Sequence, residues 1–544
     1  MAPPDRTHTL SIRLLRKAFT RESAFGPGFT QGTPKALTRL PWPHADGAEV
    51  FAGQIYSKEP DWTDLIGEIA GFPNDLNASG AGAVLFIPAG ARQFAVCFGH
   101  VHLTLDNDAF ERQFGLKVTL NSVPRNGLRS LDLATPDAVT FQKRVQASKD
   151  SDVNSFGVDM SRDLARIAGG TPTNTAFAKF VAGKDSLSIT CATNIEKLKD
   201  KCKEILDVFE SDTYKKDFSW IDNLKPVEEA SIITDLDSKI FAALSDLRNG
   251  KPNDLHMAPP EIVDYQEGST LHYNGFGSKG AGFNCLSIDD YAAELNRTGF
   301  AGTIDDIKSS HRIAAEKPGA KHISEKWKTY DCFTFEVEDK AEDGKTALSF
   351  VLFSGIWYLV DKKFKTSIEK YYESVKKITI VGPTTCRNEE DLIEDLKATR
   401  RDLLVLDQEK INPADVRYAN LEPCDFLSNK KQFIHLKDGH SSGPISHLWA
   451  QGIVSAEAFA SDAEFRKKLR SKVKSKGPAF ALLLPKSTNK PVREEYQIVF
   501  GIMRKPYADG SLGLPFFSKV SLKTAAERIT QLGFPLAIEL IEKP

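Results

Sequence analysis

The sequence predicts a multi-domain protein of the mixed α/β (α+β) class. Its 544 residues exceed the roughly 100–200 residues of a usual domain, so two to four separate cores are expected. Stretches with alternating apolar residues and stretches with helical spacing follow one another along the whole chain. From residue 386 onward their order becomes helix, three strands, helix and then further strands, which predicts a mixed sheet.

The first expected domain, residues 1–192, is an N-terminal α/β domain. It begins with the strand HTLSIRLLR, and a hairpin turns at Gly90-Ala91 between AVLFIPAG and RQFAVCFGHVHLTL. A short helix ended by glycine is expected for SRDLARIAGG.

The second expected domain, residues 193–385, combines helices with a hairpin. Apolar residues at helical spacing in IEKLKDKCKEILDVFES predict an amphipathic helix. A hairpin with an acidic, glycine-containing turn is expected in CFTFEVEDKAEDGKTALSFVLFSGIWYLVD. The helix FKTSIEKYYESVKKI closes this domain.

The third expected domain, residues 386–544, carries the α-β-β-β-α order. The helix NEEDLIEDLKATR has acidic residues in its first turn, where the helix dipole favours them. Three strands are expected in DLLVLD, ANLEPCDFLS and KQFIHLKD, and the next helix is PISHLWAQGIVSAEAF. After a basic helix, SDAEFRKKLRSKVKSK, strands are expected in AFALLLP and EYQIVFGIM, and the sequence ends with one more helix and strand.

Composition excludes several classes of protein. The net charge of −2 gives no general attraction to nucleic acid, so such binding would need local patches. A run of about 18 apolar residues is absent, and the N-terminus lacks the apolar segment of a signal peptide. Seven cysteines without a CxxC pair favour a reducing, cytoplasmic location and argue against a zinc ribbon.

The stretch LEPCDFLSNKKQFIHLKDGHSSGPISHLWAQG, residues 421–452, supports three interpretations. The first is a serine hydrolase, because Gly439 to Gly443 matches G-x-S-x-G between a predicted strand and a predicted helix, with Ser441 as the nucleophile. A triad of this order needs a later histidine, and His447 lies only six residues on, in the helix that follows.

The second interpretation is a metal-dependent nuclease of the PD-(D/E)xK kind. Asp425 ends one strand, and Lys437 stands two residues after His435 on the next strand, so alternation can place these side chains on one face. Asp425, His435 and Glu390 are the expected catalytic metal ligands, with Glu389 as the alternative to Glu390, and Lys437 would polarise the attacking water.

The expected cofactor is a divalent metal, Mg²⁺ or Mn²⁺. His435 stands where an acidic residue is expected, and imidazole suits manganese, iron, nickel or zinc better than magnesium. In the third interpretation nothing is catalysed: Asp425 ends a strand, His435 lies in a core and Lys437 is solvated.

Candidate nucleic-acid contacts come from two helices. His447 and Gln451 share one stripe of the first, and the second is a basic run that also fits a solvated face. Its candidate phosphate contacts are Lys468, Arg470, Lys472 and Lys474. Residues 275–280 fit G-x-G-x-x-G but lack a following helix, which favours a loop over a dinucleotide site.

The chain resembles a sporadically distributed bacterial family of unknown function. The resemblance rests on CDFLSNKKQFIHLKDGHSSGPISHLWAQGIVSAEAF and extends to FAVCFGH, RVQASKDSDVNSFGVDMSRDLARIAGG, LHMAPPEIVDY and LPFFSKVSL. It implies a mobile or phage-defence-associated cytoplasmic protein with a restriction-endonuclease-like segment around residues 386–505, and it implies that His435 is a family trait.

The function expected from the sequence is action on nucleic acid, as a metal-dependent nuclease of a bacterial defence or mobile-element system. The alternative is a non-catalytic nucleic-acid-binding or sensor module that keeps a degenerate nuclease fold. DNA or RNA is the expected partner, a membrane is not, and the sequence leaves open whether the chain forms a homo-oligomer.

Overall fold

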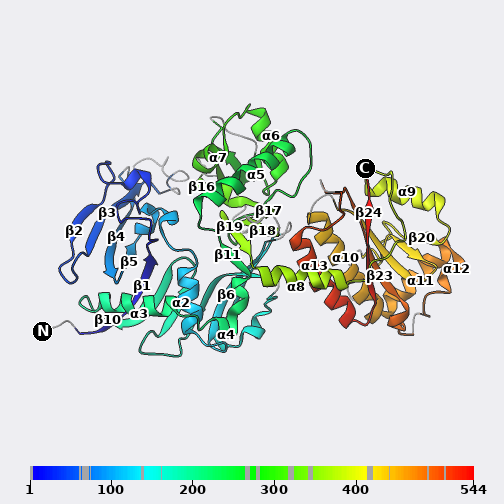
Figure 1. Cartoon of the computed structure of the whole chain (residues 1–544), viewed down its shortest axis with the longest axis horizontal. Coiled ribbons are helices and arrows are strands. Elements are labelled where there is room, and N and C mark those ends of the chain that lie inside the picture. Colours follow the sequence, from blue (N-terminus) through cyan, green and yellow to red (C-terminus); the bar gives the residue numbers. More distant parts are fainter. Residues whose placement is uncertain are drawn as a thin grey trace.

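A computed structural model describes most of the chain. The described residues are 4–60, 63, 73, 75–136, 140–160, 162–263, 270–276, 282–316, 324–340, 347–412, 421–439, 442–486, 489–507 and 510–544. Three units follow one another from blue through green to red in Figure 1, each with its own sheet or sheets.

The N-terminal unit is built on an antiparallel sheet of ten described strands, in the order β2-β3-β4-β5-β1-β10-β9-β8-β6-β7. Along the chain these strands are β1 (Arg6–Leu14), β2 (Thr38–Pro41), β3 (Glu49–Lys58), β4 (Ala78–Ala89), β5 (Arg92–Gly99), β6 (Leu128–Thr135), β7 (Phe141–Ser151), β8 (Leu164–Gly170), β9 (Phe180–Gly183) and β10 (Leu187–Thr193). Its helices are α2 (Phe114–Ser122), α3 (Leu198–Glu210) and α4 (Lys215–Phe218).

The prediction of the β4–β5 hairpin is confirmed, and its turn includes Gly90 in the left-handed conformation. The predicted helix in SRDLARIAGG is wrong, because residues 164–170 form β8, which pairs with β6 on one side and β9 on the other. Beyond the expected boundary at residue 192, α3 contributes buried apolar residues to the core of this sheet. The packing of the N-terminal unit therefore extends past that boundary.

The middle unit contains two antiparallel sheets and a group of helices. The strands are β11 (Leu224–Pro226), β12 (His256–Met257), β13 (Thr270–Asn274), β14 (Gly282–Phe283), β15 (Arg312–Glu316), β16 (Ser324–Lys328), β17 (Phe333–Lys340), β18 (Ala347–Phe353) and β19 (Ile356–Val360). The helices are α5 (Ala230–Arg248), α6 (Ile288–Arg297), α7 (Ile304–Ser310) and α8 (Lys362–Ser374). The expected hairpin is β17–β18, extended by β19.

The C-terminal unit is a mixed sheet of five described strands in the order β20-β21-β22-β23-β24. The first two pairings are antiparallel and the last two are parallel, so the expectation of a mixed sheet is confirmed. The elements are α9 (Glu389–Thr399), β20 (Leu403–Val405), β21 (Phe426–Ser428), β22 (Gln432–Asp438), α10 (Ser442–Ser461), α11 (Ala463–Lys476), α12 (Pro478–Ala481), β23 (Gln497–Arg504), α13 (Phe516–Gln531) and β24 (Leu536–Glu542).

Alternation along β22 gives the sheet two apolar faces. Phe433 packs with residues of α10 and α13, whereas Ile434 and Leu436 pack with residues of α9. One further prediction in this unit is wrong: AFALLLP does not form a strand, and its first three residues belong to the short helix α12. The backbone there folds back on α11, whose Arg470 donates hydrogen bonds to the carbonyls of Ala481 and Leu484.

The three units share a hydrophobic cluster where they meet. It joins Ala134 of β6, Phe353 of β18, Ile368 of α8 and the pair Phe516–Phe517 of α13. Glu336 of β17 also accepts hydrogen bonds from the first two backbone amides of α13. In addition, residues 376–384 run beside β24, where backbone bonds join them to Ile538 and Glu542.

Among the described residues, none of the helices combines the length and apolar character that crossing a membrane requires.

Candidate metal and phosphodiester site

The hairpin of β21 and β22 places Asp425, the residue just before β21, beside β22. The backbone N–H of Asp425 donates to the carbonyl of Ile434 at 3.0 Å, so Asp425 lies opposite the middle of β22. Its side chain accepts a hydrogen bond from the backbone N–H of Leu436 at 2.5 Å and is only 8% exposed. The carboxylate is therefore fixed against the strand that carries Lys437.

Lys437 is held by an acidic residue of α9. Its Nζ lies 2.9 Å from Oε1 of Glu389, while Oε2 of Glu389 accepts from the backbone N–H of Asp438 at 3.3 Å. Glu389 occupies the first turn of α9, after the N-cap residue Asn388, where the helix dipole stabilises a negative charge. Of the two alternatives that the sequence offers, Glu389 reaches Lys437.

Two further carboxylates come close to Asp425. One ligand oxygen each from Asp407, Glu422 and Asp425 lies within 4.8 Å of the others, and no other described group of three or more acidic, histidine or cysteine side chains has such spacing. Asp407 follows β20, and its backbone N–H donates to the carbonyl of Asp425 at 3.1 Å. We call Asp407, Glu422 and Asp425 the acidic cluster.

A tight turn fixes the backbone on one side of the acidic cluster. Gln408 adopts φ of 58°, in the left-handed region that is unfavourable for a residue with a side chain. Its backbone N–H donates to the carboxylate of Glu422, and this contact holds the turn against the segment before β21. On the other side, buried Ser455 of α10 donates to the carbonyl of Pro423. Both contacts therefore position the segment that carries Glu422 and Asp425.

The carboxyl groups of the acidic cluster lose their protons less readily than isolated carboxyl groups, because their pKa values are raised. Burial, together with the nearby carboxylates of Glu422, Glu389 and Asp407, raises the pKa of Asp425 to about 8, although the hydrogen bond from Leu436 acts in the lowering direction. Burial likewise raises the pKa values of Asp407 and Glu422, and these two side chains hydrogen-bond each other. The acidic cluster therefore has too little positive charge nearby to offset the burial and mutual repulsion of its carboxyl groups.

These residues fit a hard divalent cation. Oxygen ligands about 2.0–2.6 Å from one cation lie about 3–5 Å from one another, which matches the spacing within the acidic cluster. Three carboxylates without sulfur or imidazole favour Mg²⁺, Mn²⁺ or Ca²⁺ over softer metals. Positive charge in the cluster would also relieve the repulsion and desolvation that raise the pKa of Asp425.

The metal-ligand set expected from the sequence is only partly assembled. Asp425 belongs to the acidic cluster, but His435 is 2% exposed and lies in the core, with its ring 6.0 Å from that of Phe500. Burial lowers the pKa of His435 to about 4, which keeps the ring neutral. Glu390 is exposed and lies outside the cluster. Asp407 and Glu422 take the places that the sequence suggested for His435 and Glu390.

The two candidate ligands that sequence reasoning missed, Asp407 and Glu422, carry a weak signal. Asp407 ends the predicted strand DLLVLD, and Glu422 stands three residues before Asp425. Each is a carboxylate at the end of a strand or just before one, as Asp425 is. Their convergence depends on the antiparallel pairing of β20 with β21, which spacing alone does not reveal.

Other sequence candidates lie outside this geometry. His447 is exposed and Gln451 half-buried on α10, and both belong to the helix that covers the sheet. Ser441 of the G-x-S-x-G match lies outside the described residues, as do residues 277–280 of the glycine-rich match. The hydrolase interpretation therefore stays a prediction.

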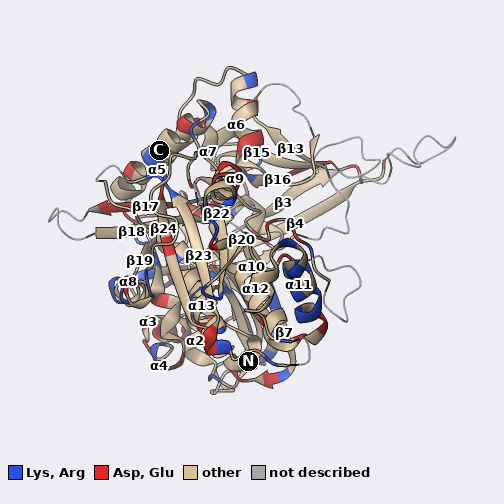
Figure 2. Ribbon diagram, turned by 90° about the vertical axis from the view of Figure 1, so that its right-hand side faces the viewer, with Lys and Arg blue, Asp and Glu red and all other residues tan. Residues whose placement is uncertain are grey.

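The basic helix α11 contacts the segment that follows Asp407, and the Lys and Arg positions colour much of its ribbon blue in Figure 2. Lys472 and Lys476 bind Glu409, two residues after Asp407, and Lys468 donates to the carbonyl of Asn412. The other two candidate phosphate contacts on α11, Arg470 and Lys474, differ from each other.

Arg470 is engaged with the backbone around α12, to which it donates two hydrogen bonds. Lys474, in contrast, is exposed and forms no ion pair within the described parts of the chain. The helix therefore combines structural cations with cations that are accessible to a ligand.

Cation binding to the acidic cluster is expected to release protons and to strengthen as the pH rises toward 8. The reason is that Asp425 must lose its proton to act as a ligand, and its pKa is about 8. Calorimetric titration with Mn²⁺ in buffers of different ionisation enthalpy measures both effects. The double variant Asp407→Asn/Glu422→Gln should lose the binding, and an unchanged, pH-independent affinity would contradict the assignment.

A family model described as a family of unknown function (DUF6119) matches residues 10–542. Neither a curated protein nor a solved structure matches the chain.

Proposed function

The chain belongs to this family of unknown function, and on the geometry of its C-terminal unit we propose that it is a metal-dependent nuclease. One observation carries the proposal: the acidic cluster, Lys437 and Glu389 converge at one end of a mixed sheet. The order α9-β20-β21-β22-α10-β23 around this sheet resembles the core of restriction-endonuclease-like enzymes. In such enzymes carboxylates and a lysine act together on a phosphodiester.

The roles of the residues follow from their positions. Asp407, Glu422 and Asp425 would hold a divalent cation, which when bound lowers the pKa of a water ligand and neutralises charge on the phosphodiester. Lys437 carries an ammonium group whose direction is set by Glu389, so it can orient the attacking water and stabilise negative charge on the phosphate. Glu389 acts through Lys437 and is a positioning residue.

The substrate side of the proposal rests on α11. A nucleic acid whose phosphodiester reached the acidic cluster would lie next to the segment 407–412, which α11 contacts through Glu409 and Asn412. The accessible cations of α11 can then contact neighbouring phosphates. This arrangement explains how a chain with a net charge of −2 can still bind a polyanion.

The test is incubation of the purified full-length chain with single- and double-stranded DNA and RNA across a panel of divalent metals. We expect cleavage with Mn²⁺ or Mg²⁺ and none with EDTA. The variant Asp407→Asn, purified identically, should be inactive, which distinguishes the chain's own activity from a contaminating nuclease. Cleavage that persists in this variant would remove the acidic cluster from the mechanism.

A second candidate is a nucleic-acid-binding module without catalysis. It is favoured by the ion pair that engages Lys437 and by the neutral, core-buried His435 at the usual acidic position. The same incubation separates the two, because the module would bind nucleic acid at every metal condition and cleave none.

Two exposed lysines of α11 are Lys474 and Lys467, the second of which pairs with Glu464 of the same helix. Replacing both with Gln should weaken binding to all nucleic-acid sequences alike. On duplex DNA, the log–log slope of affinity against salt should flatten by roughly 0.9 for each phosphate that the variant no longer binds. Filter binding across a salt series measures both the affinity and the slope. The matched control is Lys370→Gln/Lys376→Gln, which removes equal charge outside α11 and should leave the slope unchanged.

A further inference from the structure

The N-terminal unit contains a cavity of about 880 Å³ that is separate from the acidic cluster. It lies between the segment after β1, the loop from β2 to β3, and the turn between β4 and β5. Figure 1 shows these elements and the C-terminal sheet at opposite ends of the molecule. Cavities of roughly 300–1,000 Å³ are the usual size of small-molecule sites.

The lining of this cavity is rich in cations. Five basic side chains face three acidic ones, which leaves an excess of two positive charges. The basic residues are Arg16, Lys17, Arg21, Arg39 and Arg92, and the acidic residues are Glu22, Asp46 and Glu49. In a chain of net charge −2, this local excess favours an anionic ligand.

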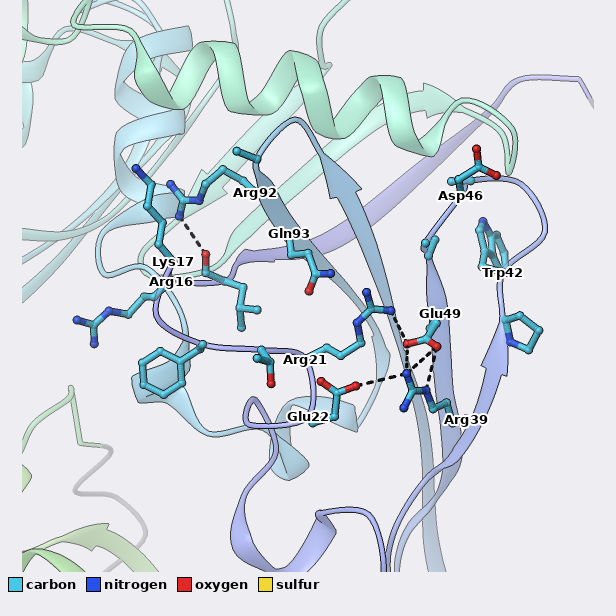
Figure 3. Close-up of a pocket in the computed structure, with 18 of the residues that line it drawn as sticks. Arg16, Lys17, Arg21, Glu22, Arg39, Trp42, Asp46, Glu49, Arg92 and Gln93 are labelled. Atoms are coloured by element: carbon cyan, nitrogen blue, oxygen red, sulfur yellow. Dashed lines mark hydrogen bonds and ion pairs between the residues drawn. The ribbon is translucent and has the colours of Figure 1, made fainter.

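Two of the arginines already converge on an anionic group. Arg39 donates two hydrogen bonds to the Glu49 carboxylate, from Nε at 2.9 Å and from Nη2 at 2.8 Å, and Arg21 donates to the same carboxylate. Figure 3 shows both guanidinium groups directed toward Glu49. Arg39 also pairs with Glu22 through Nη2 at 3.3 Å. A guanidinium has five N–H donors, so these contacts still leave donors of Arg21 and Arg39 for a ligand.

The opposite side of the cavity carries two cations, Arg16 and Lys17, that have no acidic partner among the described residues (Figure 3). Arg16 donates only to backbone carbonyls, those of Asp108 at 3.2 Å and Glu228 at 3.4 Å. Lys17 is exposed and has no ion pair within the described residues. Beside them Arg92 is fixed by Glu111 and the Leu15 carbonyl, with its side chain 9% exposed. A ligand anion here would meet positive charge that the protein leaves uncompensated.

An aromatic surface completes the cavity. Trp42, half-buried between the exposed residues Pro41 and Pro43, lies on the side away from Arg16 and Lys17 (Figure 3). Its backbone N–H donates to the carbonyl of Ala48 at 2.9 Å, which closes the loop that carries it. An indole ring offers a face on which a planar ring can stack.

We propose that this cavity binds a small phosphorylated ligand with a planar ring, the class to which nucleotides belong. The phosphates contact Arg16, Lys17 and the free donors of Arg21, and the ring lies against Trp42. This site goes beyond the proposed nuclease and does not depend on it, since it shares no residue with the acidic cluster.

Equilibrium dialysis of the full-length chain with ATP, AMP, adenosine and inorganic phosphate tests the proposal. EDTA is present throughout, so that a nucleotide cannot bind through a cation at the acidic cluster. We expect ATP and AMP to bind, and adenosine and phosphate to bind at least about tenfold more weakly, because each supplies half of the contacts.

Two variants and one control locate the binding. The double variant Arg16→Gln/Lys17→Gln should weaken ATP binding about tenfold or more, since it removes charge-assisted hydrogen bonds to the phosphates. Trp42→Leu should weaken ATP and AMP alike without changing the binding of phosphate. Lys149→Gln on β7, which removes a charge from the same unit outside the cavity, should bind ATP as the unaltered chain does.

Three results would overturn the proposal: neither ATP nor AMP binds; the double variant binds ATP as tightly as the Lys149→Gln control; or phosphate binds as tightly as ATP. The last result would make the cavity a site for simple anions. Circular dichroism of each variant shows that a loss of binding does not come from unfolding, and the double variant keeps the test valid if Trp42→Leu unfolds.

Discussion

Replacing Lys437 with alanine is expected to lower the metal-dependent cleavage of nucleic acid by a factor of about 100 or more. General acid–base or charge-stabilising side chains commonly contribute about 10²–10⁴-fold, and Lys437 is the cation that Glu389 directs at the end of β22. Binding of nucleic acid should change little, because the accessible cations of α11 remain. Single-turnover cleavage and filter binding on the same preparations separate the two effects.

Lys430→Ala is the matched control. Lys430 is an exposed lysine in the turn at the other end of the same hairpin, so its removal alters charge without approaching the acidic cluster. The positioning role of Glu389 is tested with Glu389→Gln, which keeps a hydrogen-bond acceptor for Lys437 and should retain more activity than Glu389→Ala. If Lys437→Ala cleaves as fast as the Lys430→Ala control, the lysine has no part in the reaction.

Replacing Asp425 with asparagine should abolish cleavage and, without a cation, stabilise the C-terminal unit at neutral and alkaline pH. Asp425 has a folded-state pKa of about 8, above the unfolded value of about 3.9, so the folded chain binds more protons between these values. The stability of the unaltered chain therefore falls as the pH rises from 4 to 8. Asparagine carries no such penalty and can still accept from Leu436.

The expected gain is on the order of 2 kcal/mol or more at pH 8 and close to none at pH 4, since each pKa unit corresponds to about 1.4 kcal/mol. Urea unfolding in EDTA at a series of pH values measures it. Asp402→Asn is a control of opposite sign, because Arg400 lowers the pKa of Asp402 and its ion pair is partly exposed. With saturating Mn²⁺ the order should reverse, because a bound cation stabilises only the chain that keeps Asp425. Equal stabilities of Asp425→Asn and the unaltered chain across the pH range would show that folding does not raise the pKa of Asp425.

The sequence predicted the hairpin of β21 and β22 because local rules govern it. Alternation of apolar residues sets the two faces of β22, and the polar turn before it sets the register, so Asp425 and Lys437 could be placed on neighbouring strands. The same alternation does not tell whether a polar residue faces solvent or core. His435 therefore remained a candidate ligand until its packing against Phe500 was known.

Asp407 and Glu422 could not be assigned in this way. Asp407 stands 18 residues before Asp425, and its approach depends on the pairing of β20 with β21 and on the left-handed turn at Gln408. Non-local pairing of this kind leaves no fixed spacing in a single sequence. The basic helix α11 is a second example, because its number of charges did not reveal that Arg470 donates hydrogen bonds to the backbone around α12.

The N-terminal cavity left even less trace in the sequence. Its cations come from the segment after β1, from β2 and from the start of β5, so no short window contains them together. Only the order of strands in the ten-stranded sheet brings these segments to one place. The amino-acid composition gives the number of arginines but does not show which residues lie beside them in the folded chain.

The shared cluster of the three units has a consequence for how the chain can be divided. Phe516 and Phe517 of α13 are buried against residues of the other two units, and residues 376–384 form backbone bonds with β24. A polypeptide that starts at residue 386 would lack those bonds and would expose both phenylalanine side chains to water. Such a fragment would present a new apolar surface and an unpaired sheet edge, the two features that promote self-association. The proposed cleavage of nucleic acid is therefore best tested on the intact polypeptide.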